Sequence, residues 1–165
     1  MNSFSGVVLD FPSLTGLTFL NMNNTGFFGV FPWKSLENIT GLQFLIVRDN
    51  LFKNSSFPVE ILKLERLYWL YLTNCSLEGR IPPEIGNLME FTNLELSDNT
   101  LSGPIPPEIN KLNKLLQLEL YDNYLTGDFP VGFGNLSSLI KFDASNNNLK
   151  GDLSELKSFT QLVSL

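Results

Sequence analysis

The chain has no histidine, and this absence excludes several kinds of chemistry. Catalytic Ser-His-Asp triads, Cys-His nucleophile systems and histidine-based metal sites all need the missing imidazole. The sequence therefore predicts no catalytic residue, no metal ligand and no cofactor.

Cysteine, clustered basic residues and long apolar runs are scarce as well. Cys75 is the single cysteine among 165 residues, so no disulfide can form within the chain. The net charge is −6, and Lys and Arg are scattered, which argues against nucleic-acid binding. No run of eighteen apolar residues exists to span a membrane, and residues 1–10 lack the basic start and apolar run of a signal peptide.

What the chain does contain is a repeat of the form Leu-x-x-Leu-x-Leu-x-x-Asn-x-Leu-x-Gly-x-Ile-Pro. Copies begin near residues 17, 42, 67, 91, 115 and 139, and a further copy begins at residue 162 and is cut at Leu165. Residues 1–16 fit a partial repeat, with Asn2, Phe4 and Gly6 in its tail. We interpret residues 1–165 as one continuous array, because near-equal steps of this length are typical of solenoids.

Each part of the repeat has a structural role. The x-Leu-x-Leu-x segment alternates with period two, so we expect a short strand with its leucines inward. The Asn at the ninth position should satisfy backbone groups of the neighbouring turn, Gly permits the bend, and Ile-Pro fixes an extended segment. Strands ~4.8 Å apart on one side and a bulkier layer of short helical turns on the other predict a curved α/β solenoid.

The Leu-x-Gly-x-Ile-Pro form of the repeat resembles the plant-specific leucine-rich repeat, and it implies a right-handed superhelix with a parallel sheet on its concave face and 3-10 turns on its convex face. Segments such as Leu-Tyr-Trp-Leu-Tyr-Leu-Thr-Asn-Cys-Ser at 67–76 and Gly-Asp-Leu-Ser-Glu-Leu at 151–156 resemble the receptor-like kinase branch that includes HAIKU-type and, more distantly, HAESA-type peptide receptors. The resemblance covers the whole chain.

The resemblance implies a parent protein with an ectodomain outside the plasma membrane, one membrane span and a cytoplasmic Ser/Thr kinase. Its ligand would be a small secreted peptide or protein lying along the concave face, and a co-receptor would bind through regions that this chain does not contain. The chain departs from the family pattern because it has no N-terminal cap with a cysteine pair, no membrane helix, no kinase and no Arg-x-Arg pair for a peptide carboxylate.

The x positions of each strand predict which side chains face outward from the sheet. Phe44, Ile46, Trp69 and Tyr71 would form an apolar patch across two adjacent strands, which solvated sheet faces rarely carry without a partner. We therefore predict that a ligand binds there. Aromatic packing between strands, a glycan or flanking parts of the parent protein are alternative explanations.

Three acidic residues, Glu95, Glu119 and Asp143, occupy one register on successive strands, and Tyr121 lies beside them. Neighbouring like charges repel, so the column suggests a cationic partner, such as an Arg or Lys of a peptide. A solvated acidic face is an alternative interpretation. Two carboxylates ~5 Å apart would also match a retaining glycosidase, but an open face offers no pocket that would raise one pKa.

Two further features are expected to be structural or modified positions. Cys75 stands where other repeats have the ladder Asn, which predicts a buried and unreactive thiol. Asn-x-Ser/Thr sequons suggest N-glycosylation and passage through the secretory pathway, and those at Asn38 and Asn135 occupy equivalent convex positions. The other sequons are at Asn23, Asn54 and Asn74.

The leading interpretation is thus the ligand-sensing region of a receptor kinase. An alternative is a free-standing apoplastic repeat protein, such as one that resembles inhibitors of polygalacturonases, but such a protein should carry cysteine-stapled caps. Another is a truncated, inactive gene product, since the first Met falls inside a repeat.

Overall fold

The computed structural model describes residues 6–152 and 154–163. The predictions that involve Asn2, Phe4 and Leu165 lie outside these described residues.

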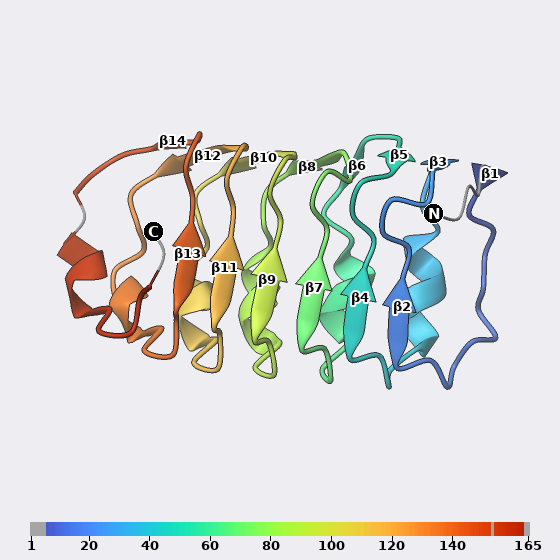
Figure 1. The fold of residues 1–165 in the computed structure, drawn as a ribbon, viewed down its shortest axis with the longest axis horizontal. Coiled ribbons are helices and arrows are strands. Elements are labelled where there is room, and N and C mark those ends of the chain that lie inside the picture. Colours follow the sequence, from blue (N-terminus) through green and yellow to red (C-terminus); the bar gives the residue numbers. More distant parts are fainter. Residues whose placement is uncertain (1–5, 153, 164–165) are drawn as a thin grey trace.

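Short strands at the x-Leu-x segments form one parallel sheet, in the order β13-β11-β9-β7-β4-β2. The strands are β2 (Phe19–Asn21), β4 (Phe44–Ile46), β7 (Trp69–Tyr71), β9 (Asn93–Glu95), β11 (Gln117–Glu119) and β13 (Lys141–Asp143). They stand side by side in sequence order from the N-terminal to the C-terminal side of the molecule (Figure 1). Corresponding residues pair across every junction, so that Leu45, Leu70, Leu94 and Leu118 lie in one row.

A second layer of strands runs along one edge of the coils, above the first sheet in Figure 1. It consists of two parallel sheets with the orders β1-β3-β5 and β14-β12-β10-β8-β6. The strands are β1 (Gly6–Val7), β3 (Phe27–Gly29), β5 (Leu51–Phe52), β6 (Ser55–Ser56), β8 (Leu77–Gly79), β10 (Thr100–Gly103), β12 (Tyr124–Gly127) and β14 (Asn148–Leu149). Gly103 and Gly127 have φ of 78° and 81°, which only glycine adopts without strain, and the chain turns there toward the convex side.

The third layer consists of 3-10 helices that lie behind the six-stranded sheet (Figure 1). They are η1 (Trp33–Asn38), η2 (Val59–Lys63), η3 (Pro83–Asn87), η4 (Pro107–Lys111), η5 (Phe133–Asn135) and η6 (Ser154–Ser158). The segment after each Ile-Pro is too short for a longer helix, and η3 and η4 both begin at a proline, whose φ suits a first helical turn.

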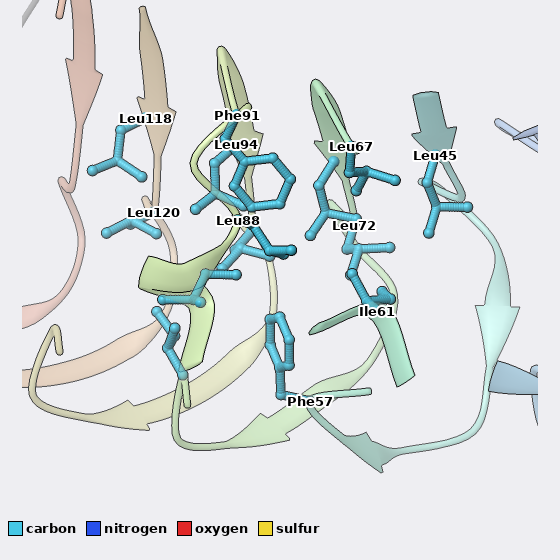
Figure 2. Close-up of a cluster of buried hydrophobic side chains, with 14 of the residues drawn as sticks. Leu45, Phe57, Ile61, Leu67, Leu72, Leu88, Phe91, Leu94, Leu118 and Leu120 are labelled. Atoms are coloured by element: carbon cyan, nitrogen blue, oxygen red, sulfur yellow. The ribbon is translucent and has the colours of Figure 1, made fainter. Parts of the chain in front are cut away.

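The inward leucines fill the space between the sheet and these helices. Leu70, Leu94 and Leu118 are fully buried, and so are Ile61 and Ile109 from the helical side. In Figure 2, Ile61, Leu94 and Leu118 are among the labelled side chains that fill this space along successive coils. The predicted leucine-rich repeat fold, with parallel sheets and 3-10 turns, is confirmed.

The ladder Asn side chains connect successive coils in the turns that follow the strands of the six-stranded sheet. Asn99 donates hydrogen bonds to the carbonyls of Leu72, Leu96 and Ser97 at 2.8–2.9 Å, and its Oδ1 accepts from the N–H groups of Cys75 and Leu77 at 3.1 and 3.0 Å. These backbone groups are buried, so the amide replaces the water that they would otherwise need.

Cys75 occupies the same position one coil earlier, as the sequence predicted. Its Sγ donates to the carbonyl of Val47 at 2.7 Å, and burial raises the pKa of the thiol to about 12. A thiol with such a pKa holds its proton at physiological pH, so Cys75 is a structural residue.

Candidate functional site

The outer surface of the six-stranded sheet carries the side chains that the sequence assigned to a ligand site. We call this surface the concave face. Because alternate residues of a strand point to opposite sides, each strand presents its first and third residues there, and the residue between them, a leucine in every strand except β13, where it is Phe142, points into the core. Two neighbouring groups of side chains share the face, one aromatic and one charged.

The aromatic row consists of Phe19, Phe44, Trp69 and Tyr71 on β2, β4 and β7. The ring centroids of Phe19 and Phe44 are 5.7 Å apart, and Trp69 meets Phe44 edge-on at 5.1 Å. Trp69 and Tyr71 are stacked, with an interplanar angle of 6°. Even so, Phe19 remains 50% exposed and Trp69 37% exposed, so the rings do not bury one another.

Tyr71 connects the aromatic row to the charged group. Burial, followed by the Glu95 carboxylate, raises the pKa of Tyr71, and its hydrogen bond with Asn93 acts in the opposite direction. The phenol is therefore neutral at physiological pH, and its hydroxyl is a polar group at the edge of an apolar surface.

The charged group, which we call the charge network, consists of Arg48, Glu95, Gln117, Glu119 and Lys141. Gln117 stands at its centre, where Nε2 donates to Glu95 Oε1 at 2.9 Å and to Glu119 Oε1 at 2.7 Å. At one end Lys141 pairs with Glu119, and at the other Arg48 Nη1 lies 3.6 Å from Glu95 Oε2. Arg48 follows β4 whereas Glu95 lies on β9, so the guanidinium reaches across β7.

These contacts bury both carboxylates, although both lie on the concave face. Glu95 and Glu119 are each 7% exposed. Burial, followed by the Glu119 carboxylate, raises the pKa of Glu95, while Arg48 and Lys141 oppose that rise. The expectation that these acids lie open to a partner's cation is therefore wrong for Glu95 and Glu119, because the chain supplies both counter-ions itself.

The same contacts weigh against a glycosidase centre. A sugar would have to reach the space between the two carboxyl groups. The amide of Gln117 occupies that position and donates to both carboxylates. The arrangement therefore leaves no room for a glycosidic bond between the two carboxylates.

The remaining predicted site residues lie at the C-terminal side of the face. Asp143 Oδ1 accepts hydrogen bonds from the backbone N–H and the hydroxyl of Ser145 at 2.9 and 2.7 Å. Tyr121 is half-buried, and its pKa is raised by burial and by the Asp98 carboxylate. Ile46 is half-buried and lies between Asn21 and Tyr71 in the register.

Several residues of the face were not predicted as site residues. Phe19 extends the aromatic row by one strand, and Arg48, Gln117 and Lys141 complete the charge network. Their signal in the sequence was the register itself, since each stands at an x position of its repeat. What the sequence could not show is that Arg48 reaches past one strand to meet an acid on the next.

All five sequon asparagines are exposed. Asn38 and Asn135 end η1 and η5 on the convex side. Within the described residues, neither side chain forms a hydrogen bond. Asn54 donates to Glu78 at 3.2 Å, and Asn74 donates to Asp49 at 3.4 Å. Asn23 lies just beyond β2.

Among residues 6–152 and 154–163, no helix has the length and apolar character needed to cross a bilayer. The same residues contain no group of three or more His, Cys, Asp or Glu side chains placed to hold a metal ion.

Comparison with known proteins agrees with this geometry. The family described as Leucine Rich Repeat matches residues 66–88, 90–112 and 114–136. Two Arabidopsis thaliana proteins are similar: the receptor-like protein kinase HAIKU2 is 53% identical over 82 residues, and receptor-like protein kinase 7 is 58% identical over 112 residues. These alignments cover 50% and 53% of this chain, which spans only 8% and 12% of the two relatives.

A solved structure extends the similarity to most of the chain. The Arabidopsis receptor kinase HAESA, crystallised with the peptide hormone IDA and the co-receptor SERK1, superposes with a TM-score of 0.86 at 37% identity. The superposition covers 90% of this chain and 25% of that one.

Proposed function

The chain is a leucine-rich repeat ectodomain region of the plant receptor-like kinase type, and from that premise we propose that it senses a secreted peptide through its concave face. The aromatic row would hold an apolar part of the peptide, and the charge network would hold its polar groups. A peptide in this position would lie across the strands and contact several coils at once.

The observation that carries this proposal is the exposure of the aromatic row on an otherwise regular sheet. Trp69 and Phe19 keep much of their surface in water although they pack against other rings. Aromatic side chains in such positions often supply much of the binding energy of an interface. The peptide hormone bound to HAESA adds support, because that receptor shares this fold.

Other parts of the proposal concern the whole protein. The parent would place this region on the extracellular side of the plasma membrane and would carry its kinase elsewhere in the sequence. A co-receptor would bind through regions that this chain does not contain. Glycans at Asn38 and Asn135 would occupy the convex side and leave the concave face free, and Asn23, Asn54 and Asn74 are further candidate sites.

A displayed library of random dodecapeptides, selected on the full 165-residue chain, would test the proposal. The affinity of the enriched peptides would then be measured for the native chain and for Trp69→Ala. Loss of the indole should weaken binding by roughly 1–3 kcal/mol, since a central aromatic contact would be missing.

Met89→Ala is a matched control, because Met89 is an exposed apolar side chain in the loop after η3, away from the concave face. It should leave the affinity unchanged. Peptides that bind Trp69→Ala as tightly as the native chain would remove the aromatic row from the site.

A further inference from the structure

The charge network has a property that peptide binding alone does not require. Each of its buried carboxylates already has a cation from the chain, Lys141 for Glu119 and Arg48 for Glu95. The two cations come from opposite ends of the network, and both keep part of their side chain in solvent, with 45% exposed for Lys141 and 39% for Arg48. They therefore stand between the carboxylates and anything that approaches the face.

Gln117 fixes this arrangement from the middle. Its Nε2 holds the two carboxylates, and its Oε1 accepts from Asn93 Nδ2 at 2.9 Å. Thr73 Oγ1 lies 3.5 Å from Glu95 Oε2, on the side away from Gln117. Glu95 thus has a partner on each oxygen, whereas Gln117 and Lys141 both contact Oε1 of Glu119, so a new donor at any of these oxygens would compete with one already present.

We propose that Arg48 and Lys141 are built-in counter-ions that set the charge selectivity of the concave face, so that the ligand segment over β9 and β11 carries neutral side chains. This inference rests on the proposed function, because it specifies the chemistry of the peptide that the same face would bind. The ligand is then an extended peptide with an apolar anchor on the aromatic row and uncharged hydrogen-bonding groups over the charge network.

The physical reason is an exchange of ion pairs. A ligand cation that approached Glu119 would have to lose its hydration to join a carboxylate whose charge Lys141 already balances, and at Oε1 it would only replace one ion pair with another. Neutral amides, hydroxyls and backbone groups lose less hydration on binding and can bond to the outer side of the network. The face therefore rejects a basic side chain although its central column is acidic.

Removal of one built-in cation tests the proposal. Lys141→Met keeps an unbranched side chain of similar length and removes the charge, which leaves Glu119 buried without its cation. A buried carboxylate without a counter-ion is unfavourable, so a ligand cation that restores the pair should now be favoured. The variant should change its preference from neutral to basic peptides.

The experiment selects the same displayed dodecapeptide library on the full-length native chain, on Lys141→Met and on Lys114→Met. Lys114 is the matched control, because it pairs with Glu90 at 2.7 Å away from the concave face. For one peptide enriched on each bait, a synthetic pair that differs in a single Lys or norleucine measures the preference directly. Circular dichroism of each bait checks its fold, and Lys141→Gln serves if Lys141→Met does not fold.

The native chain and Lys114→Met should enrich peptides without an excess of basic residues and should bind the norleucine peptide at least as well as the Lys peptide. Lys141→Met should enrich basic residues and prefer the Lys peptide by about tenfold more than the native chain does. A native chain that already favours basic peptides, or a Lys141→Met selection that matches the native one, would overturn the inference.

The two proposals fail in different ways. Peptides that need Trp69 but ignore the charge at position 141 would leave the proposed function intact and overturn only the charge selectivity. If no peptide binds any bait in a Trp69-dependent manner, the proposed function is wrong and the charge selectivity falls with it.

Discussion

The two halves of the concave face are built on the same backbone but stabilised differently. In the N-terminal half, β2, β4 and β7 present rings that pack against one another and stay partly exposed. In the C-terminal half, β9, β11 and β13 present charges that are paired within the chain. The Asn ladder differs as well, since the N-terminal coils have Thr25, Asn50 and Cys75 at ladder positions, whereas the later coils have Asn99, Asn123 and Asn147.

This difference separates the inward positions, which stabilise the fold, from the outward positions, through which we propose that the chain contacts a ligand. The inward positions are apolar in both halves, and Leu45, Leu70, Leu94 and Leu118 are fully buried, whereas Leu20 on the first strand is partly buried. Only the outward positions change, so the two halves would present different chemistry to a ligand, with aromatic rings in one half and paired charges in the other. A partner that covers an exposed apolar surface removes that surface from water, which favours binding. A charged surface whose ion pairs are already formed within the chain offers a charged partner little additional binding energy.

The largest expected difference between the halves lies in the ladder. Asn99→Ala would leave two buried N–H groups and three carbonyls without the amide, and it should lower the free energy of unfolding by roughly 3 kcal/mol. Cys75→Ala removes one thiol and its contact with Val47, and it should cost about 1 kcal/mol. Urea denaturation of both variants measures the two losses, and equal losses would show that the ladder does not differ between the halves.

The next effect concerns the charge network itself, without any ligand. Lys141→Met should lower the free energy of unfolding by about 1 kcal/mol, because Glu119 is buried and loses its counter-ion, although the exposed ammonium limits the effect. Lys114→Met breaks an ion pair between more exposed groups and should change the stability less. Thermal denaturation of the two variants gives the comparison, and a larger loss for Lys114→Met would contradict the structure.

A smaller effect should depend on pH. Burial raises the pKa of Glu95, so the folded chain binds that proton more tightly than the unfolded chain does. Its contribution to stability is therefore present below the unfolded pKa of about 4.3 and is lost as the pH rises through the folded pKa.

Glu95→Gln stays uncharged and should raise Tm relative to the native chain at about pH 7.5, with little difference at about pH 4. Glu65→Gln, at an exposed loop position, is the control. Scanning calorimetry at both pH values decides the sign, and a lower Tm for Glu95→Gln near neutral pH would mean that the Arg48 pair outweighs burial.

The smallest expected effect is at the edge of the face, where the two halves also differ. Asn74 donates to Asp49 in the N-terminal half, whereas Asp98 and Asp122 are neighbouring carboxylates in the C-terminal half. Burial and Asp122 raise the pKa of Asp98. Asp98→Asn should therefore stabilise the chain by a few tenths of a kcal/mol near neutral pH. Asp49→Asn, which removes the Arg48 partner, should not stabilise it.

The sequence predicted the fold well because the repeat encodes it locally. The positions of Leu70, Leu94 and Leu118 set the strands, and the ladder position of Asn99 set the turns that join them. The buried thiol of Cys75 followed from the same frame. These features depend only on distances along the chain, which a regular repeat converts directly into distances in space.

The candidate site could be predicted only in part. The predicted register correctly placed Phe44, Trp69 and Tyr71 beside one another, because the repeat length determines which residues of successive strands are neighbours. It could not show that long side chains would reach beyond their own strand. Arg48 and Lys141 were therefore not included among the predicted site residues, and Glu95 and Glu119 were interpreted as open although they are buried.

The central claim is that a peptide binds the concave face with its apolar anchor on the N-terminal half. The most direct test is the NMR chemical-shift perturbation of the full chain when a peptide enriched on it is added. The account predicts the largest changes at the Trp69 indole and at Phe44 and Ile46, with smaller changes at Gln117. Changes confined to convex residues such as Met89 and Asn87, with the Trp69 indole unmoved, would contradict it.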